Sequence, residues 1–340
     1  MPSIIEQIAA DLNISSASVS RALNDRPGVS AQLRARILQR ARELNYSPSL
    51  NARGLATAQT FTLGFFVREK PGLPTQADPF YGEILHGVEQ TCAQTAYHVT
   101  IGTLTDDILA APQGFRFTKE RRIDGMILAG PDIPTEFIMA MLQTGLPVVL
   151  VDNRLEYWPA NCVNSDDEAG AYRAAQHLLD GGHRAIGVIA GPAHWPSNAR
   201  RVGGYRRALQ RAGLPLYSAH VDRTTIDSGA EAYDQLMRQH PEVTAICAVN
   251  DAMAIGAIRT AQKAGRSVPG DLSVVGFDDI DWAALNNPPL TTVNIPKRQM
   301  GREAASRLLA LLQDPEAAPA EVIVAVQLVA RESSAPRKEA

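Results

Sequence analysis

The chain has 340 residues and a mass of 36.7 kDa, and 45% of its residues are hydrophobic, enough to bury the cores of two or three domains. The formal net charge of −3 argues against a protein that coats nucleic acid or an acidic membrane with its whole surface. No apolar run approaches the ~18 residues of a membrane span, and the N-terminus lacks an export signal, which predicts a cytoplasmic protein without membrane contact.

The charge is unevenly distributed along the chain. Residues 1–60 hold seven arginines and four acidic residues, a net charge of +3, whereas residues 61–340 hold 26 basic and 32 acidic residues, a net charge of −6. A small basic head therefore precedes an acidic body.

Three short helices are predicted in residues 1–46. Apolar residues recur at helical spacing in three stripes: Ile5, Ile8, Ala9 and Leu12; Val19, Ala22 and Leu23; and Leu33, Ile37, Ala41 and Leu44. Asn13 lies at the corner between the first two helices, where a left-handed backbone is needed, and Ser15 and Ser30 are predicted to cap the second and third. Three short helices around one small core predict an all-α helix-turn-helix domain over residues 1–46.

The second helix, in the stretch "NISSASVSRALN", exposes small polar side chains and one arginine. In a helix-turn-helix unit this helix enters the major groove of DNA, where hydroxyls and amides hold phosphates and an arginine can grip guanine. Base readout is predicted for Ser16, Ala17 and Arg21, and phosphate contacts for Ser15, Ser18, Ser20, Asn24 and Ser30. The alternative is a solvated serine-rich helix, but serine is a poor residue for a helix interior, which favours DNA binding.

Residues 47–59 connect the head to the body. Pro48 ends an extended segment, and residues 50–56 have the length of about two helical turns. Gly54 weakens such a helix by roughly 1 kcal/mol relative to alanine, so the helix is expected to fold only when something holds it. A plain linker is the alternative.

Residues 60–332 alternate strand-like apolar runs with helical patterns. The runs are "FTLGFFV", "HVTIGTL", "GMILAG", "PVVLVD", "AIGVIAG", "TAICAVND" and "LSVVGFDD". Helices are predicted between them, among them Tyr81–Thr95, Ala169–Leu179 and Asp251–Ala264. Repeated βα units imply an α/β body of parallel sheets with helices on both faces, and two such series indicate two lobes. Residues 333–340 are predicted to form a flexible tail.

Polar residues lie where the predicted strands end, the edge at which open α/β sheets bind ligands. Asp152 ends "PVVLVD", Asn250 lies at the end of "TAICAVND", and Asp278 at the end of "LSVVGFDD", while Arg201 follows "AGPAHWPSN". Carboxylates, an amide and an arginine suit sugar hydroxyls, and four aromatic residues can stack on a sugar ring: Phe80, Tyr81, Trp195 and Trp282. The alternative is that the polar residues cap helices and the aromatic residues belong to the core.

Several words of the sequence resemble the lactose-repressor-like (LacI/GalR) transcription regulators over nearly the whole chain. They are "IAADLNISSASVSRALN", "VSAQLRARILQRARELNYSPSLNARGLA", "DPFYGEILHGVEQ", "RRIDGMILAG", "AGPAHWPSNARRVGGYRRAL", "AICAVNDAMAIGAI", "DLSVVGFDDI" and "PPLTTVNIP". The resemblance assigns sequence reading to the positions of Ser16, Ala17 and Arg21, and a phosphate contact to Tyr46. Asn13 replaces the family's corner glycine, and Leu33 replaces a hydroxyl that some relatives carry for a phosphate contact.

The resemblance also implies a role for the segment Pro48–Ala56. In the family the matching segment is a hinge helix that orders on operator DNA and pairs with its dimer mate in the minor groove. Leu55 matches the leucine that inserts between base pairs, and Ala52 matches a small residue on the groove side.

For the body, the resemblance implies a periplasmic-binding-protein fold whose lobes cross near residues 162, 291 and 322. The expected N-lobe covers residues 60–161 and 292–321, and the expected C-lobe covers residues 162–291 and 322–332. Arg201, Asn250 and Asp278 match the usual effector contacts of the family, and Asp152 matches a less uniform one.

Enzyme and cofactor signatures are absent from the sequence, which has no G-x-G-x-x-G after a strand, no G-x-x-x-x-G-K-[ST] and no G-x-S-x-G. The seven histidines lack zinc spacing, and Cys92, Cys162 and Cys247 are predicted to be buried thiols. No catalysis, cofactor or metal is therefore expected.

Together these features predict a homodimeric repressor of a carbohydrate uptake or catabolic operon, nucleoid-associated when it is bound to double-stranded operator DNA. A small sugar effector would change the affinity for a palindromic operator by linkage. No heptad tail follows Arg331, so a dimer is expected rather than a tetramer. Two alternatives remain: a sugar-binding module without a DNA function, and a regulator of the same fold controlled by a purine-type corepressor.

Overall fold

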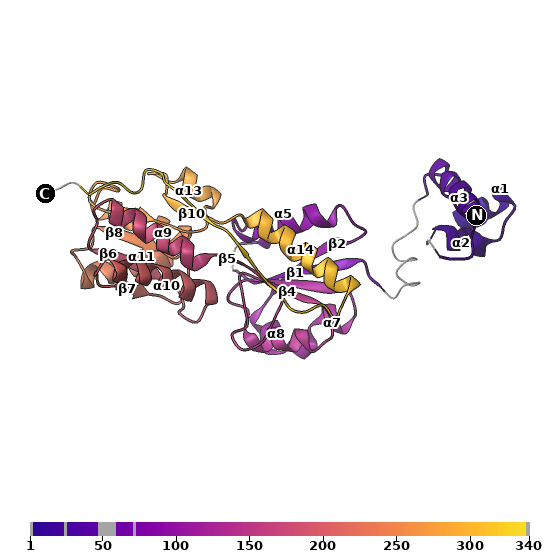
Figure 1. Cartoon of the computed structure of the whole chain (residues 1–340), viewed down its shortest axis with the longest axis horizontal. Coiled ribbons are helices and arrows are strands. Elements are labelled where there is room, and N and C mark those ends of the chain that lie inside the picture. Colours follow the sequence, from indigo (N-terminus) through magenta and orange to yellow (C-terminus); the bar gives the residue numbers. More distant parts are fainter. Residues whose placement is uncertain (1–2, 24–25, 47–58, 71–72, 338–340) are drawn as a thin grey trace.

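The computed structural model describes residues 3–23, 26–46, 59–70 and 73–337. These residues form a helical head and a body of two α/β lobes (Figure 1). The predicted fold class is confirmed. The phosphate contact predicted for Asn24 and the hinge residues Ala52 and Leu55 lie outside the described residues.

The head contains the three predicted helices: α1 (Ile4–Leu12), α2 (Ser16–Leu23) and α3 (Ala31–Glu43). Ile8, Val19 and Ile37, one from each helix, are fully buried against one another. Asn13 has a left-handed φ of 52° at the corner after α1, as predicted, because asparagine tolerates that backbone better than most residues. The core and the corner together fix the angle at which α2 leaves α1.

Both predicted helix caps are present in the head. The Ser15 hydroxyl accepts a hydrogen bond from the backbone N–H of Ser18 at 3.2 Å, and the Ser30 hydroxyl accepts one from Leu33 at 3.3 Å. Each bond satisfies an N–H group that has no partner within the helix, which sets where α2 and α3 begin.

The first lobe is built on a six-stranded parallel sheet in the order β11-β5-β4-β3-β1-β2. Its strands are β1 (Thr62–Arg68), β2 (His98–Leu104), β3 (Gly125–Ala129), β4 (Val148–Val151), β5 (Cys162–Ser165) and β11 (Glu321–Val324). Short helical segments lie between the strands in the chain: η1 (Thr75–Ala77), α6 (Asp106–Ala110), η2 (Pro112–Gly114) and α7 (Arg116–Lys119).

Helices cover both faces of this sheet, as the βα pattern predicts. The helices α5 (Tyr81–Cys92) and α14 (Lys297–Gln313) lie on one face, and α8 (Thr135–Leu142) lies on the other (Figure 1). Alternate residues of β1 supply the two cores: Phe65 packs with the α5 side and Phe66 with the α8 side. The strands β1, β3 and β4 are therefore almost continuously apolar, which makes them recognisable in the sequence, whereas β5 and β11 are not among the predicted strands.

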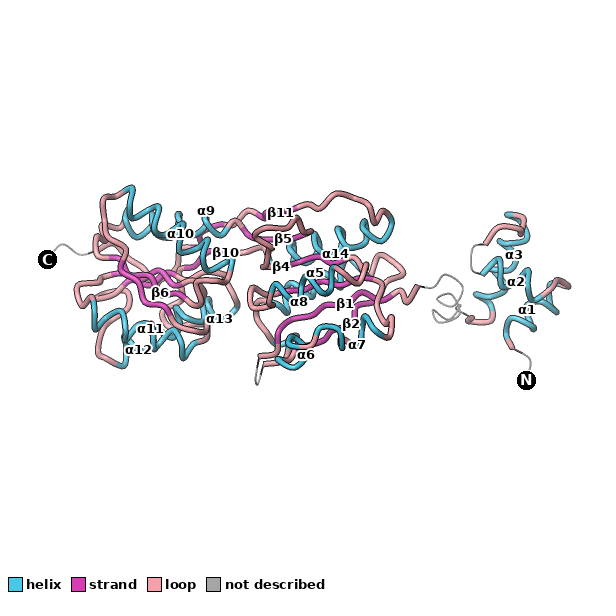
Figure 2. Tube along the Cα trace, turned by 90° about the horizontal axis from the view of Figure 1, so that it is seen from below, coloured by secondary structure: helices cyan, strands magenta, loops and turns pink. Residues whose placement is uncertain are grey.

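The second lobe has a four-stranded parallel sheet in the order β7-β6-β8-β9. Its strands are β6 (Ile186–Ala190), β7 (Tyr217–His220), β8 (Ala245–Ala248) and β9 (Ser273–Val275). Figure 2 shows α9 (Asp167–Asp180) and α10 (Pro196–Arg211) on one face, with α11 (Ile226–Gln239) and α12 (Asp251–Lys263) on the other. The short helix α13 (Asp281–Leu285) and an antiparallel pair, β10 (Thr292–Asn294) and β12 (Gln327–Val329), complete this lobe.

The chain crosses between the lobes three times, in each case two or three residues after the predicted points near residues 162, 291 and 322. β5 and β11 belong to the sheet of the first lobe, and β10 pairs with β12 beside β9 in the second lobe. The crossings therefore follow these strands, after Ser165, Asn294 and Val324, instead of preceding or interrupting them. Apolar runs reveal a strand but do not reveal which sheet it pairs with.

The predicted flexible tail is also wrong for residues 333–337. The Ser333 hydroxyl is fully buried, donates to the carbonyl of Val274 at 2.6 Å and accepts from the Thr291 N–H at 2.8 Å. The Arg337 N–H donates to the carbonyl of Gly181 at 2.8 Å. Backbone groups at the ends of the second sheet are satisfied by this segment, so it packs although it is polar.

The three cysteines are free and buried, as predicted. Burial raises the pKa of Cys92 and of Cys162 to about 11, so both thiols stay protonated at neutral pH. Within the described ranges, none of the helices is long and apolar enough to cross a bilayer.

Candidate functional site

A cavity of about 100 Å³ lies between the two lobes, at the ends of strands from both sheets. We call it the cleft. Its lining residues are Lys70, Phe80, Tyr81, Pro131, Asp132, Asp152, Trp195, Ser197, Asn198, Arg201, Thr224, Asn250 and Asp278. Seven of the eight residues predicted to contact an effector line it, and the eighth, Trp282, does not. The cavity therefore lies at the strand ends, where the polar residues of the sequence predicted a ligand site.

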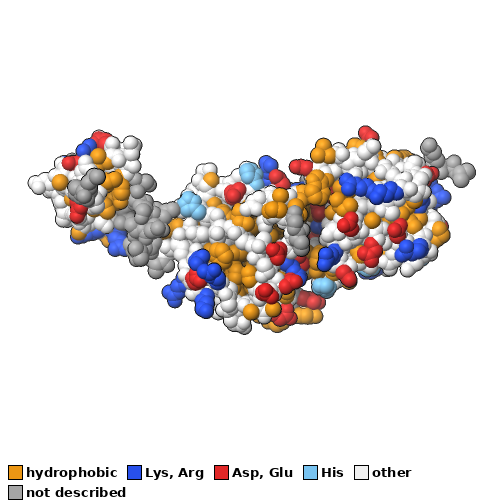
Figure 3. Space-filling view, turned by 180° about the vertical axis from the view of Figure 1, so that it is seen from behind, with side chains coloured by type: hydrophobic (Ala, Val, Ile, Leu, Met, Phe, Trp, Pro, Cys, Tyr) orange, Lys and Arg blue, Asp and Glu red, His pale blue; other side chains and the backbone are white. Residues whose placement is uncertain are grey.

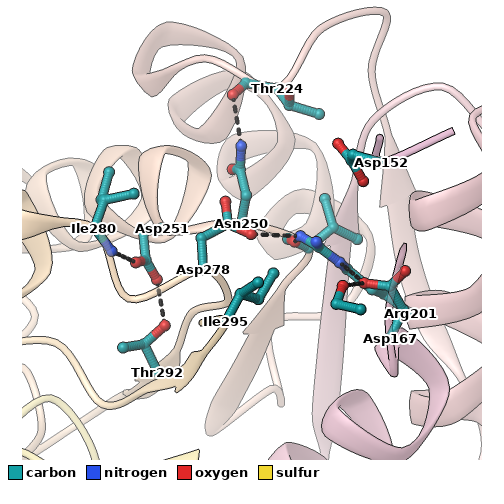
Figure 4. A network of polar contacts seen from close by, with 12 residues as sticks. Asp152, Asp167, Arg201, Thr224, Asn250, Asp251, Asp278, Ile280, Thr292 and Ile295 are labelled. Carbon is teal, nitrogen blue, oxygen red and sulfur yellow. Dashed lines mark hydrogen bonds and ion pairs between the residues drawn. The ribbon is translucent and has the colours of Figure 1, made fainter. Parts of the chain in front are cut away.

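Arg201 is the centre of the second-lobe wall of the cleft (Figure 4). Its Nε donates to Asp167 at 2.8 Å, and its Nη1 donates to Asp278 at 2.9 Å and to the carbonyl of Val249 at 2.6 Å. The guanidinium also stacks 4.0 Å from the ring centre of Phe277. These contacts use Nε and Nη1 and hold the plane of the guanidinium, which leaves Nη2 for a ligand.

The charge on Arg201 is secured by its neighbours. Burial alone would lower the pKa of this arginine, but Asp278, Asp167 and Asp152 together raise it above its ordinary value. A buried charge of this kind persists only because partners compensate for the lost hydration. Arg201 is thus a permanent cation at the floor of the cleft.

Asp278 reaches the cleft because of an unusual backbone at the end of β9. Its φ is 111°, a region that side chains other than glycine rarely adopt, and the Nζ of buried Lys297 donates to its carbonyl at 2.6 Å. The next residue, Asp279, is turned away and bonds Asn294 and Arg331 instead. Burial raises the pKa of Asp278 to about 6, although Arg201 and Lys297 lower it.

Asn250 caps a helix, as the alternative interpretation of the strand-end polar residues predicts. Its side-chain oxygen accepts from the Met253 N–H at 2.9 Å and caps α12, and its amide donates to the carbonyl of Thr224 at 3.0 Å. It therefore joins the β8 end to the loop before α11 while it lines the cleft. Capping and ligand contact are compatible, because the oxygen has a second lone pair.

Asp152 faces this network from the first lobe, at the end of β4. Figure 4 shows it near Arg201 and Asp278 but without a bond to either. The Tyr81 hydroxyl donates to its Oδ2 at 3.0 Å. Burial raises the pKa of Asp152 to about 7, and Arg201 across the cleft opposes that rise. Around neutral pH this side chain therefore exchanges between an acceptor and a donor form.

The aromatic residues of the cleft are mostly buried, as the core alternative holds. Phe80 and Tyr81 are 9% and 6% exposed and pack edge to face at 5.1 Å. Trp195, half-buried, precedes α10 and contacts His194. Trp282 instead lies on the surface of the second lobe, 40% exposed, beside a separate cavity of about 320 Å³. The structure does not bring Trp282 to the cleft lining as predicted, because α13 places it beside Ile226, Ile255 and Arg259 around the separate cavity.

Sequence reasoning missed six polar residues at or behind the cleft: Lys70, Asp132, Asp167, Ser197, Asn198 and Thr224. Asp132 and Lys70 follow "GMILAG" and "FFVR" just as Asp152 follows its strand, so the same signal could have found them. Asp167 gave no signal of its own. It starts a helix, where acidic residues are common, and only its contact with Arg201 reveals its role.

The head presents the side chains predicted to read DNA. Ser15, Ser16, Ala17 and Arg21 are exposed, whereas Val19 is buried beneath them. The Ser15 and Ser18 hydroxyls lie 2.9 Å apart, so part of their bonding capacity is used inside the head. Ser20 and Tyr46 are half-buried and Ser30 is exposed. The start of α2 is therefore open to a partner.

On the face of the body that Figure 3 shows, acidic and basic side chains occur over both lobes. A helix-turn-helix head joined to a two-lobed α/β body with a polar cleft defines the class of ligand-controlled transcription regulators.

Comparison with known protein families supports this class. Residues 4–49 match the model described as "Bacterial regulatory proteins, lacI family", and residues 175–334 match the model described as "Periplasmic binding protein-like domain". The chain belongs to the lacI family and is a DNA-binding transcriptional regulator.

Curated relatives match the chain almost from end to end. It is 32% identical to the HTH-type transcriptional repressor CytR of Escherichia coli K12 over 97% of this chain and 96% of that protein. It is 30% identical to the ribose operon repressor of Haemophilus influenzae over 97% and 98% of the two chains. It is also 30% identical to the repressor PurR of Photobacterium profundum over 91% and 92%.

Solved structures share the whole architecture. A Lac repressor dimer bound to operator and the anti-inducer ONPF superposes with a TM-score of 0.82 at 26% identity, covering 98% of this chain and 100% of that one. A complex of the regulator CelR with cellobiose gives 0.73 at 29% identity, with the same coverage. A LacI-family regulator of Enterococcus faecium with bound ribose gives 0.69 at 28% identity, covering 82% and 100%.

Proposed function

We propose that this regulator represses genes for the uptake or breakdown of a small carbohydrate, and that a sugar in the cleft controls its affinity for a palindromic operator. The observation that carries the proposal is the ring formed by Arg201, Asn250 and Asp278 from one lobe and Asp152 from the other. These groups can donate and accept hydrogen bonds around a polyol, and their position between two lobes couples binding to lobe closure.

The relatives support a sugar. One relative is named for a ribose operon, and two structures of the same fold hold ribose and cellobiose. A purine-type ligand is the second candidate, because the chain is equally similar to PurR and because Phe80, Tyr81 and Trp195 offer aromatic surfaces to the cleft. The cavity of about 100 Å³ favours the smaller ligand.

On DNA, Ser16, Ala17 and Arg21 read bases from the open start of α2. Ser15, Ser18, Ser20, Asn24, Ser30 and Tyr46 hold phosphates. Ala52 and Leu55 enter the minor groove. Exposure of the α2 start supports the first of these assignments. The regulator works where its operator is, in the bacterial cytoplasm at the nucleoid, and it catalyses no reaction.

The regulator acts as a homodimer, because a palindromic site requires two heads related by a two-fold axis. A Lac repressor dimer is among its structural neighbours. The second lobe also exposes an apolar surface of the kind that subunit contacts cover: Leu285 is 82% exposed and Trp282 is 40% exposed. Analytical ultracentrifugation of the purified chain tests this, and a monomer at micromolar concentration would contradict it.

The deciding experiment is selection of bound sequences from a random duplex library at ~150 mM salt, where nonspecific binding is weak. The expected result is an enriched palindrome, and a panel of sugars and purines is then scored by its effect on that complex. Enrichment without a response to any sugar would remove the carbohydrate effector. No enrichment would favour a sugar-binding module without a DNA function.

Replacing Arg21 by alanine tests the reading helix. The variant is expected to lose roughly 10- to 100-fold in affinity for the selected palindrome and to bind random DNA almost as before, because a bidentate base contact contributes about 1–3 kcal/mol. The matched control is Arg36→Ala, an exposed arginine of α3, which should change specific affinity less than about threefold. Equal losses on both DNAs would reduce Arg21 to a phosphate contact.

A further inference from the structure

We propose that the cleft selects an uncharged polyhydroxy ligand over its phosphate ester, and that Asp132, with Asp152 beside it, enforces this choice. The inference rests on the proposed sugar effector and specifies its chemical form. It follows from the ion pairs that the charged side chains of the cleft already form with one another.

The first cation of the cleft, Lys70, is occupied. Its Nζ lies 2.7 Å from Asp78 Oδ2 and 4.7 Å from the centre of the Tyr81 ring. Asp78 itself is fixed, because its other oxygen accepts the backbone N–H groups of Phe80 and Tyr81 at 2.9 Å each. The positive charge of Lys70 is therefore already compensated by a fixed carboxylate before any phosphate arrives.

The charge of the second cation, Arg201, is compensated by two carboxylates, although its Nη2 stays open to a ligand hydroxyl. Arg201 is 4% exposed, and its ion pairs with Asp167 and Asp278 are both shorter than 3 Å. Three cations lie at or behind the cleft, Lys70, Arg201 and Lys297, against five carboxylates: Asp78, Asp132, Asp152, Asp167 and Asp278. The balance of charge is therefore negative, and the carboxylates that line the cleft are Asp132, Asp152 and Asp278.

Asp132 lies in the wall where the ligand would meet the first lobe. A Cβ placed on Gly130, whose φ is 127°, would lie 2.7 Å from Asp132 Oδ1 and 3.3 Å from the Tyr81 hydroxyl. The carboxylate therefore sits against the bare backbone at the end of β3, next to the hydroxyl that donates to Asp152. Two carboxylates thus flank one hydroxyl, which suits ligand hydroxyl donors and repels a phosphate.

The N-terminal turn of α10 also attracts anions, since Ser197 and Asn198 line the cleft there. Its pull is equivalent to roughly half a positive charge. The first helical residue, Pro196, has no N–H to offer, and three carboxylates outweigh the helix end. The balance remains against a phosphate.

The test is isothermal titration of the full-length protein with matched pairs of a free sugar and its phosphate ester: ribose and ribose 5-phosphate, glucose and glucose 6-phosphate, fructose and fructose 1-phosphate. Burial raises the pKa of Asp152 to about 7, so the titrations are made at pH 8, where this carboxylate is mainly ionised. We expect at least one free sugar to bind and its ester to bind at least about 30-fold more weakly, since like charges brought together in a binding site repel strongly.

The variant Asp132→Asn keeps the shape of the side chain and removes its charge. This variant should reduce the ratio between the dissociation constants of the ester and the free sugar about tenfold. The exposed control Asp107→Asn should leave that ratio unchanged. The wild-type comparison decides the proposal even if the variant does not fold. An unchanged ratio in folded Asp132→Asn would show that this residue does not enforce the choice.

The outcomes separate this inference from the function on which it rests. An ester that binds as tightly as its sugar, or tighter, overturns the inference and leaves a carbohydrate effector in place. If neither member of any pair binds, and operator binding is intact, the carbohydrate effector itself is refuted, and the inference falls with it.

Discussion

The two walls of the cleft differ in how far their polar groups are satisfied before any ligand arrives. On the second lobe, Arg201 and Asp278 bond each other, and Asn250 bonds both a helix end and a loop carbonyl. On the first lobe, Asp152 has the Tyr81 hydroxyl as its partner. The second-lobe wall is therefore a rigid anchor formed with the fold, whereas the first-lobe wall gains more of its contacts from the ligand.

This difference bears on how the lobes respond to an effector. A ligand that docks on the preorganised wall loses little entropy in ordering it. The contacts it then makes to Asp152 and Asp132 are available only when the first lobe is in reach, so they favour one arrangement of the lobes. Coupling to the head would then be limited by the first-lobe contacts.

The largest expected effect follows from breaking the anchor with Arg201→Met. The change leaves Asp167 and Asp278 buried without their cation, which costs about 3–5 kcal/mol of unfolding free energy and abolishes the effector response. Chemical unfolding of the body measures the first, and operator binding with and without the effector measures the second. The matched control on the same helix is Arg207→Ala, whose exposed pair with Glu168 should contribute less than about 1 kcal/mol. Equal losses of unfolding free energy and of effector response in both variants would show that Arg201 is no more important than an exposed arginine of the same helix.

A second, smaller effect is a pH dependence of stability. Burial raises the pKa of Asp278 to about 6 and of Asp152 to about 7, whereas an unfolded aspartate titrates near ~3.9. The folded protein therefore holds extra protons, and the associated stability is full below about pH 4 and is lost as pH rises through 6 and 7.

Thermal unfolding between pH 5 and pH 8 measures this dependence. Asp152→Asn should flatten the upper part of the curve, around pH 7, and raise stability at pH 8, because no charge is then buried. The surface change Asp107→Asn should reproduce the wild-type curve. If the slope of the wild-type curve around pH 7 to 8 survives unchanged in Asp152→Asn, the titration near pH 7 belongs to another group.

The smallest expected effect concerns the single hydrogen bond between the Tyr81 hydroxyl and Asp152 on the first-lobe wall of the cleft. Tyr81→Phe removes the donor to Asp152 and keeps the ring that packs against Phe80, so effector affinity should fall about fivefold with little change in unfolding. Titration of the sugar found in the panel measures it. Tyr205→Phe is the control, since this hydroxyl donates to the buried carbonyl of Ala248 and should alter stability more than affinity. If Tyr205→Phe lowers effector affinity more than Tyr81→Phe does, effector affinity depends more on the second-lobe wall than on the first-lobe wall.

Much of the site could be predicted from local chemistry. Asp152, Asn250 and Asp278 follow apolar runs that read as parallel strands, and carboxyl ends of such strands meet at one edge. The same rule applied to "GMILAGPD" would have included Asp132. Asp167 and Lys297 could not be found this way, because their importance lies in contacts with Arg201 and with the Asp278 carbonyl, far away in sequence.

The sequence by itself determined the three helices of the head, their corner at Asn13, their serine caps and the strand ends that line the cleft, because these depend on spacing and turn chemistry within a few residues. Only the tertiary structure decided that β5, β10 and β11 end before the lobes are crossed, that Ser333 is buried and that Trp282 lines a cavity separate from the cleft. Strand pairing and burial are set by segments that meet across hundreds of residues, and no local pattern records which segments will meet.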